Sequence, residues 1–235
     1  MPPRLLRATI AAVCLSTSFP LMAQTVVGPD SEASRFNRLR DLSIRHQLAV
    51  PPASPDVFGT VAVGAGVTFY DARFRRVSTT DRAHPMVVAL AQGLHGLSRE
   101  EQLVRVQREV RAKVRWASDL DTMKVADLWA NAGETLERGA GDSEDIAVVE
   151  MQALKLAGWS PRDLYISIGR EKSVGAHVVL LARAPSGFYV LDDRASRPLT
   201  TQQQGRFTPI LTLGEGKSWI HGRRVSGGGA RLSAR

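Results

Sequence analysis

Three side chains in the second half of the sequence have the chemistry of an acyl-transfer site. Ser143 offers a hydroxyl nucleophile within the run Gly141-Asp142-Ser143-Glu144-Asp145, His177 offers an imidazole base, and Asp192 offers a carboxylate that orients the base. Such a set hydrolyses or transfers acyl groups when the fold brings the three groups together. The sequence therefore raises the hypothesis of a Ser-His-Asp hydrolase.

The residues around Ser143 predict the start of a helix at Asp142 or Ser143. The chain is broken at Gly139-Ala140-Gly141, and apolar residues then follow at helical spacing up to Gly158. Ser and Asp are preferred N-caps, so a purely structural role as a helix cap is the alternative to catalysis. The two roles are compatible, because a helix start also presents backbone N–H groups that can bind an oxyanion.

The placement of His177 and Asp192 depends on a predicted β-hairpin. Strands are expected at 176–183 and 188–191, with Ala184-Pro185-Ser186-Gly187 as the turn. This pairing sets position 179 opposite Asp192 and makes His177 its diagonal neighbour, about 7 Å away between backbones. A slip of one residue would leave Asp193 as the partner. The alternative is a hydrogen-bonded core histidine.

Carboxylates cluster on both sides of this helix start. Asp142, Glu144 and Asp145 lie within four residues, and Asp119 and Asp121 lie upstream. Calcium prefers several oxygen ligands, which these residues can supply, although their spacing is not that of an EF-hand loop. The alternative is a set of solvated acids that stabilise the helix dipole. No pattern favours zinc, a phosphate-binding loop or an organic cofactor.

The surrounding elements predict an α+β fold. A capping box at Ser98-Arg99-Glu100-Glu101 starts a helix that should reach about Trp116, and a second short helix is expected at 124–129. Strands are expected at 164–168, 207–213 and 219–220 besides the hairpin. Helices followed by antiparallel strands are typical of the α+β class. Residues 98–216 would form this core, and 24–97 an N-terminal arm and extended segment, with a strand or irregular hairpin at 57–77.

The N-terminus predicts an export signal. Arg4 and Arg7 precede an apolar run at 8–21, and a cut is expected before Gln24, so residues 1–23 would be removed. The run is too short to span a bilayer, and no later segment is apolar enough. We expect a periplasmic protein without an integral membrane segment. Cys14, the only cysteine, would be lost with the signal, which excludes thiol chemistry and disulfides.

The formal charge of +8 is concentrated near the C-terminus, so it does not indicate nucleic-acid binding. The basic residues there are Lys217, Arg223, Arg224, Arg231 and Arg235. Between residue 24 and residue 216 the charges nearly balance. Residues 217–235 are expected to contain the end of the last strand and a Gly-rich, disordered tail. This tail is either simply solvated or weakly attracted to acidic surfaces.

The motifs together resemble the bacterial transglutaminase-like cysteine proteinases, whose better known members are periplasmic proteases that clip adhesins from the cell surface. The matching residues, in order, are Asp121, Trp129-Ala130, Glu134, Gly141–Asp145, Ala176-His177 and Leu191-Asp192-Asp193. The resemblance implies a papain-like or transglutaminase-like core. It also implies nucleophile, base and acid roles for Ser143, His177 and Asp192, and calcium binding at Asp142 and Glu144.

The sequence departs from the family pattern at the nucleophile. Ser143 stands in place of the cysteine, Asp193 in place of an Asn, and Asn131-Ala132 in place of Thr-Pro. A thiol readily forms a thiolate with its histidine, whereas a hydroxyl must lose its proton during attack. A site shaped for sulfur would hold the shorter serine too far from its base, and a misplacement of about 1 Å costs on the order of a hundredfold in rate.

Three functions follow as hypotheses. The first is a periplasmic hydrolase of peptide or related acyl bonds. The second is an inactive pseudoprotease that binds a peptide or protein partner, and the third is acyl transfer to an amine with the same residues.

Overall fold

The computed structural model describes residues 52–125, 127–225 and 229–231. The predicted signal at 1–23, with Cys14, and residues 24–51 of the predicted N-terminal segment lie outside the described residues. Everything described belongs to one compact unit that starts at Val50.

The helices precede most of the strands along the chain. They are α2 (Tyr70–Ser78), α3 (Pro85–Gln92), α4 (Arg99–Lys113), α5 (Asp119–Thr122), α6 (Ala132–Arg138) and α7 (Ser143–Leu156). The capping box predicted at Ser98 is confirmed, because the Ser98 side chain accepts from the backbone N–H of Glu101 while the Glu101 carboxylate accepts from that of Ser98. The helix that should carry Ser143 at its start is confirmed as α7.

The strands form one antiparallel sheet and a separate short pair. They are β1 (Val61–Gly64), β2 (Arg115–Trp116), β3 (Ala140–Gly141), β4 (Leu164–Glu171), β5 (Gly175–Ala184), β6 (Gly187–Leu191), β7 (Leu199–Thr200), β8 (Phe207–Gly214), β9 (Lys217–Val225) and β10 (Gly229–Arg231). The sheet order is β1-β9-β8-β4-β5-β6-β7, with β10 on β9, and β2 pairs with β3 in parallel. The predicted α+β class, with an antiparallel sheet after the helices, is confirmed.

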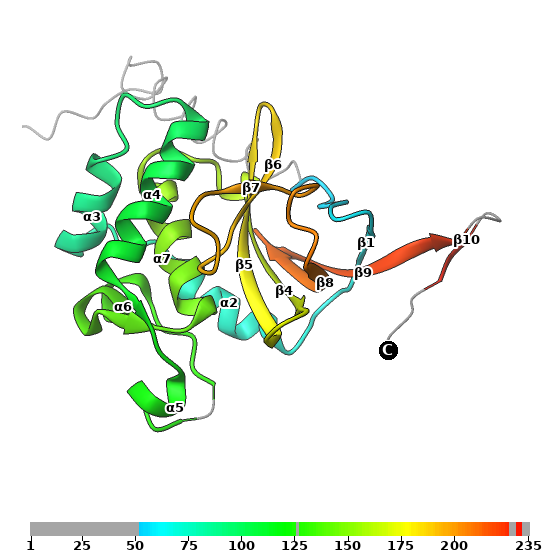
Figure 1. Ribbon diagram of the computed structural model, residues 1–235, viewed down its shortest axis with the longest axis horizontal. Helices are drawn as coiled ribbons and strands as arrows, with labels where there is room; N and C mark the ends of the chain where they lie inside the picture. The colour runs from blue at the N-terminus through cyan, green and yellow to red at the C-terminus, as the bar shows by residue number, and fades with distance from the viewer. Residues whose placement is uncertain (1–51, 126, 226–228, 232–235) are drawn as a thin grey trace, which may run out of the picture. The chain divides into compact units, whose positions relative to one another are not determined.

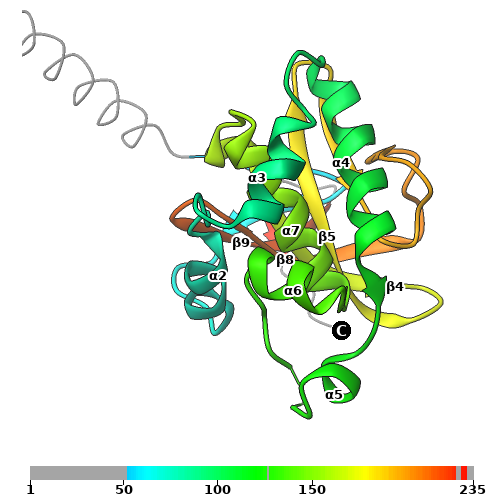
Figure 2. The ribbon, with the colours of Figure 1, turned by 90° about the vertical axis from the view of Figure 1, so that its left-hand side faces the viewer.

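The helices gather on one side of the sheet, with α7 against β5 and β4 (Figures 1 and 2). This arrangement explains why β5 is apolar from Val178 to Ala182. Val178 and Leu180 belong to the core cluster shared with the helices, whereas Val179 and Leu181 belong to a second cluster on the other face, with Trp219. Alternate side chains of a strand point to opposite faces, so a strand covered on both sides has no polar stripe.

Two local expectations for the segments before α6 were wrong. Within 57–77 only Val61–Gly64 is a strand, and Tyr70–Ser78 is helix α2, which buries Phe74 and Val77 at helical spacing. The short helix expected at 124–129 lies instead at 119–122. Ser118 caps it by accepting from the N–H of Asp121, and Lys124, with φ of 61°, is unsuited to continuing it.

The basic C-terminal end was expected to be disordered from about Gly222. Strand β9 instead continues to Val225 and pairs with β1, β8 and β10. Backbone hydrogen bonds of the ladder do not depend on side-chain hydrophobicity, which is why a Gly- and Arg-rich composition concealed these strands.

Candidate active site

Ser143 is the first residue of α7 and lies at the end of a tightly fixed connection. Helix α6 ends at Gly139, whose φ of 62° is the left-handed conformation that glycine tolerates best. The chain then pairs with β2 and enters α7 with Asp142 as the N-cap, whose carboxylate accepts from the N–H of Asp145 at 3.4 Å. Because Asp142 supplies the cap, the hydroxyl of Ser143 is not used for capping and is available for another role.

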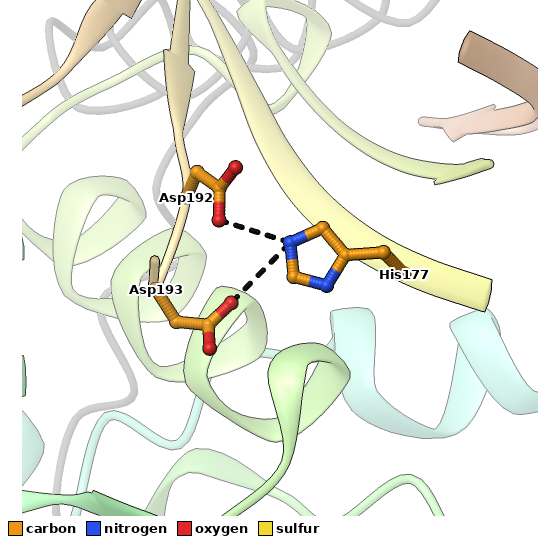
Figure 3. Close-up of side chains that lie close together, drawn as sticks. All are labelled: His177, Asp192 and Asp193. Atoms are coloured by element: carbon orange, nitrogen blue, oxygen red, sulfur yellow. Dashed lines mark hydrogen bonds and ion pairs between the residues drawn. The ribbon is translucent and has the colours of Figure 1, made fainter. Parts of the chain in front are cut away.

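His177 and Asp192 lie together, as the predicted hairpin requires. Strands β5 and β6 pair Leu180 with Leu191 and Ala184 with Gly187, which is the predicted register. His177 Nε2 lies 2.9 Å from Asp192 Oδ1, and both side chains are buried (Figure 3). An ionised carboxylate can only accept, so Nε2 carries the proton and donates it. The second ring nitrogen, Nδ1, points away from the carboxylates in Figure 3 and can act as the base.

The carboxylate of Asp192 is held by three donors. Oδ1 accepts from His177 and from the backbone N–H of Arg194 at 2.9 Å, and Oδ2 accepts from Gln204 Nε2 at 2.6 Å. Burial alone would raise the pKa of Asp192, but the hydrogen bonds from His177 and Arg194 outweigh it and keep that pKa below its usual value. Asp192 is therefore an ionised and fixed partner of the imidazole.

Ser143 and His177 line the same cavity, which has a volume of about 250 Å³. Its walls also include Tyr70 of α2, Trp129 and Ile168. The rings of Tyr70 and Trp129 lie 6.0 Å apart between centroids. The cavity is thus a recess of mixed character, with the hydroxyl of Ser143, the imidazole of His177 and the acidic residues Asp127 and Glu144 beside its apolar walls. Among the described residues no hydrogen bond joins Ser143 to His177.

Asp193 and Glu150 place two more carboxyl groups behind His177. Asp193 Oδ1 lies 3.5 Å from His177 Nε2, so the residue expected as the fallback partner is a second neighbour of the ring (Figure 3). Glu150 of α7 is only 1% exposed and its Oε1 has no partner among the described residues. Burial, and then the charges of Asp193 and Asp192, raise the pKa of Glu150 well above its usual value.

A second group of carboxylates lies at the start of α7. Oxygens of Asp119, Asp142 and Glu144 lie within 4.8 Å of one another. Asp119 is 2% exposed; its Oδ2 accepts from the N–H of Leu128, while its Oδ1 has no partner among the described residues. Burial and the charge of Glu144 raise the pKa of Asp142, and burial raises that of Glu144. An orphaned carboxylate oxygen beside two further carboxylates fits a hard cation such as calcium.

The sequence pointed to some of this arrangement and missed the rest. The structure brings Asp119, not Asp121, to the other two acids, because Asp121 bonds to Ser118 at the start of α5. Glu150 lies on the apolar face of α7, and an acid among apolar residues at helical spacing is a signal that identifies a buried carboxyl. Gln204 lies in a polar loop, where its type and spacing carry no signal.

A comparison with protein families decides the relationship of the chain. Residues 81–218, more than half of the 235 residues, match the family described as the bacterial transglutaminase-like cysteine proteinases (BTLCP). The chain belongs to this family. Helix α2, which contributes Tyr70 to the cavity, precedes the matched range, so this wall of the cavity lies outside the part that defines BTLCP members.

Solved structures share the fold. The chain is similar to Legionella pneumophila LapG in its calcium-bound form, with 23% identity and a TM-score of 0.51 over 56% of this chain and 74% of LapG. The EGTA-treated form of the same protein matches with 20% identity and a TM-score of 0.52 over 66% of this chain and 87% of LapG. At this identity the likeness supports the BTLCP fold alone. A search of curated proteins found no match.

Proposed function

We propose that this BTLCP protein hydrolyses peptide or related acyl bonds with Ser143 as nucleophile, His177 as base and Asp192 as the residue that orients the base. The observation that supports the proposal is the cavity whose wall contains both Ser143 and His177, with the imidazole bonded to a buried, ionised Asp192. Three hydrogen-bond donors on the buried carboxylate of Asp192 are the arrangement expected of a working site rather than of one that has lost its function.

The proposed reaction uses the two ring nitrogens of His177 for different purposes. The Nε2–H group keeps its proton and stays hydrogen-bonded to Asp192. Nδ1 takes the proton of the Ser143 hydroxyl while the hydroxyl oxygen attacks the substrate carbonyl. Backbone N–H groups at the start of α7 stabilise the oxyanion. The leaving amine takes the proton from Nδ1, and a water molecule, deprotonated by the same nitrogen, then hydrolyses the acyl-serine and restores the hydroxyl.

We also propose calcium as the ion for the acidic group at the start of α7. Asp119, Asp142 and Glu144 would hold it, and LapG has been crystallised with calcium. The ion would supply positive charge that neutralises these carboxylates. The residues that would hold the ion come from two segments. One is the α5 region, which carries Asp119, and the other is the start of α7, which also carries Ser143. Binding would therefore fix the nucleophile's segment against the loop before it.

The experiment that tests the hydrolase is covalent labelling of the purified protein. We expect a fluorophosphonate adduct on Ser143, located by peptide mapping, that disappears in His177→Ala and in Ser143→Ala. Ser143→Cys should react with a thiol probe and keep or gain turnover of a peptide substrate. Turnover that is identical in the unmodified protein and in Ser143→Ala would reject the proposal.

The second candidate is an inactive pseudoprotease that binds a peptide or protein. Two observations favour it: no hydrogen bond joins Ser143 to His177 among the described residues, and the hydroxyl is shorter than the thiol that gives BTLCP proteins their family name. Labelling only of Ser143→Cys, and never of Ser143, would indicate a preserved cavity without a competent nucleophile. A pull-down with Ser143→Ala should then still capture a partner.

The proposed setting is the periplasm, with residues 1–23 removed on export and a polypeptide as the substrate or partner. Within the described part of the chain, none of the helices is both long and apolar enough to cross a membrane. Cell fractionation, with mass determination of the mature N-terminus, tests the export proposal. A protein that retains residues 1–23 in the cytoplasmic fraction would contradict it.

A further inference from the structure

A second cavity lies beside Asp192 of the His177–Asp192 pair. It has a volume of about 590 Å³, within the range of ligand-binding pockets. Asp192 contributes to its wall, whereas His177 lines the cavity that contains Ser143. The two cavities therefore meet opposite members of one hydrogen-bonded pair.

The walls of this second cavity are strongly basic. Arg194, Arg197 and Arg206 come from the loops that follow β6 and precede β8. Its two acids are already engaged: Asp192 bonds to His177, and Glu171 accepts from Arg206 Nε at 2.8 Å. Within the described ranges, the side chains of Arg194 and Arg197 have neither an ion-pair partner nor a hydrogen bond. The charge of Arg194 acts on Asp192 and Asp193, whose pKa values it lowers, so Arg197 is the arginine left to give the cavity a net positive charge.

The polar floor of the cavity is buried and fixed. Gln204 is 7% exposed; its Nε2 donates to Asp192 and its Oε1 accepts from the backbone N–H of Arg206 at 3.3 Å. Glu171 is 4% exposed and is bonded to Ser173 as well as to Arg206. The arginines therefore lie beside two buried side chains, Gln204 and Glu171, that hydrogen bonds hold in place. A guanidinium group can donate two parallel hydrogen bonds to a planar anion, and a carboxylate has the matching geometry.

We propose that this cavity is a carboxylate-binding subsite that recognises an acidic side chain of the polypeptide substrate. The inference rests on the proposed function, because it assumes that a polypeptide lies across the His177–Asp192 pair. A single acidic residue near the scissile bond would place its carboxylate between Arg194 and Arg197. The subsite makes the protein selective for acidic segments, and its arginines take no part in the chemical step.

The test is peptide binding to the protein that carries Ser143→Ala, so that no turnover occurs. The probe is a fluorescein-labelled hexapeptide of alternating Gly and Asp, and its counterpart has Asn in place of Asp. Fluorescence anisotropy at low salt should show the Asp peptide binding at least about tenfold more tightly, because each charge-assisted hydrogen bond is strong. The preference should shrink as salt is added.

Arg197→Gln should reduce the affinity for the Asp peptide by about tenfold or more, since Arg197 is exposed and has no partner within the described residues to disturb. The matched control is Arg108→Gln, which removes the same charge from an exposed position on α4, and it should change the affinity by less than about twofold. Equal losses in the two variants, or equal binding of the Asp and Asn peptides, would overturn the subsite.

Inorganic phosphate provides the final comparison. Displacement of the Asp peptide by phosphate, with the same sensitivity to Arg197→Gln, supports an anion site that the peptide uses. Phosphate binding that leaves the peptide undisturbed would overturn the proposal in favour of a free-anion site. Because binding is measured without turnover, a protein that binds the Asp peptide but never forms an adduct on Ser143 would reject the hydrolase and keep the subsite.

Discussion

Replacement of Glu150 by Gln should stabilise the protein, and the gain should grow with pH. Glu150 is 1% exposed, and burial followed by the charges of Asp193 and Asp192 raises its pKa well above the usual 4.5. The charge of Arg111 acts in the opposite direction. At pH values between the usual pKa and the raised one, folding therefore binds a proton at Glu150 that the unfolded chain has released.

The sign and size follow from this difference. A group whose pKa is raised in the folded protein contributes its full stability below the pKa of the unfolded chain, and that contribution is lost as the pH rises through the folded pKa. The free energy of unfolding of the unmodified protein should therefore fall by about 1.4 kcal/mol per pH unit relative to that of the Glu150→Gln variant. The difference should grow with each pH unit from about pH 5 up to the raised pKa of Glu150.

The assay is urea unfolding, followed by tryptophan fluorescence at several pH values between 4 and 7.5 in the presence of EGTA. The linear dependence of the free energy on urea gives the difference between the two proteins at each pH. Glu215→Gln is the control, because its side chain is exposed and in water in both states. A difference between Glu150→Gln and the unmodified protein that stays constant from pH 5 to pH 7 would show that Glu150 is ionised when folded.

Three further predictions concern the support of the site. Gly169→Ala should cost about 1–3 kcal/mol of stability in thermal unfolding, because the added Cβ would lie 2.7 Å from the Phe207 ring; an unchanged melting temperature would refute the close packing. Gln204→Leu should cost about 1.5–3 kcal/mol in urea unfolding. It should also move the acid limb of stability upward in pH, because the lowered pKa of Asp192 contributes stability that is lost as the pH falls through it. Asp119→Asn should weaken calcium binding by roughly tenfold or more in titration calorimetry, and unchanged binding would place the ion elsewhere.

The parts of the fold that the sequence predicted are those governed by local rules. The β5–β6 hairpin could be placed because the short turn at Pro185-Ser186 fixes the register, and the register alone brings His177 to Asp192. The start of α7 could be placed because a glycine break and an acidic cap precede an apolar helical repeat. In both cases the deciding interactions span only a few residues.

The parts that it did not predict depend on contacts between distant segments. Asp119 joins Asp142 and Glu144 only because α5 begins at Asp119, and both acids of the Asp119-Leu120-Asp121 loop were equal candidates in the sequence. Tyr70 reaches the cavity of Ser143 from a helix more than seventy residues upstream in the chain. No spacing rule links such positions, because tertiary packing determines them.

The buried carboxyl groups bear directly on whether a serine can work in this fold. A cysteine site begins with a thiolate and imidazolium pair, but a serine site must create the positive ring during attack, so the groups around the ring matter more. Here one imidazole faces an ionised Asp192 and lies 3.5 Å from Asp193, where BTLCP-like sequences were expected to carry a neutral Asn. Burial raises the pKa of Asp193 and the charge of His177 lowers it, so a positively charged ring and the Asp193 carboxylate stabilise each other. The second carboxyl would thus offset part of the positive charge that a nucleophilic Ser143 would place on His177. This physical link between two departures from the family pattern favours the proposed hydrolase over the inactive pseudoprotease.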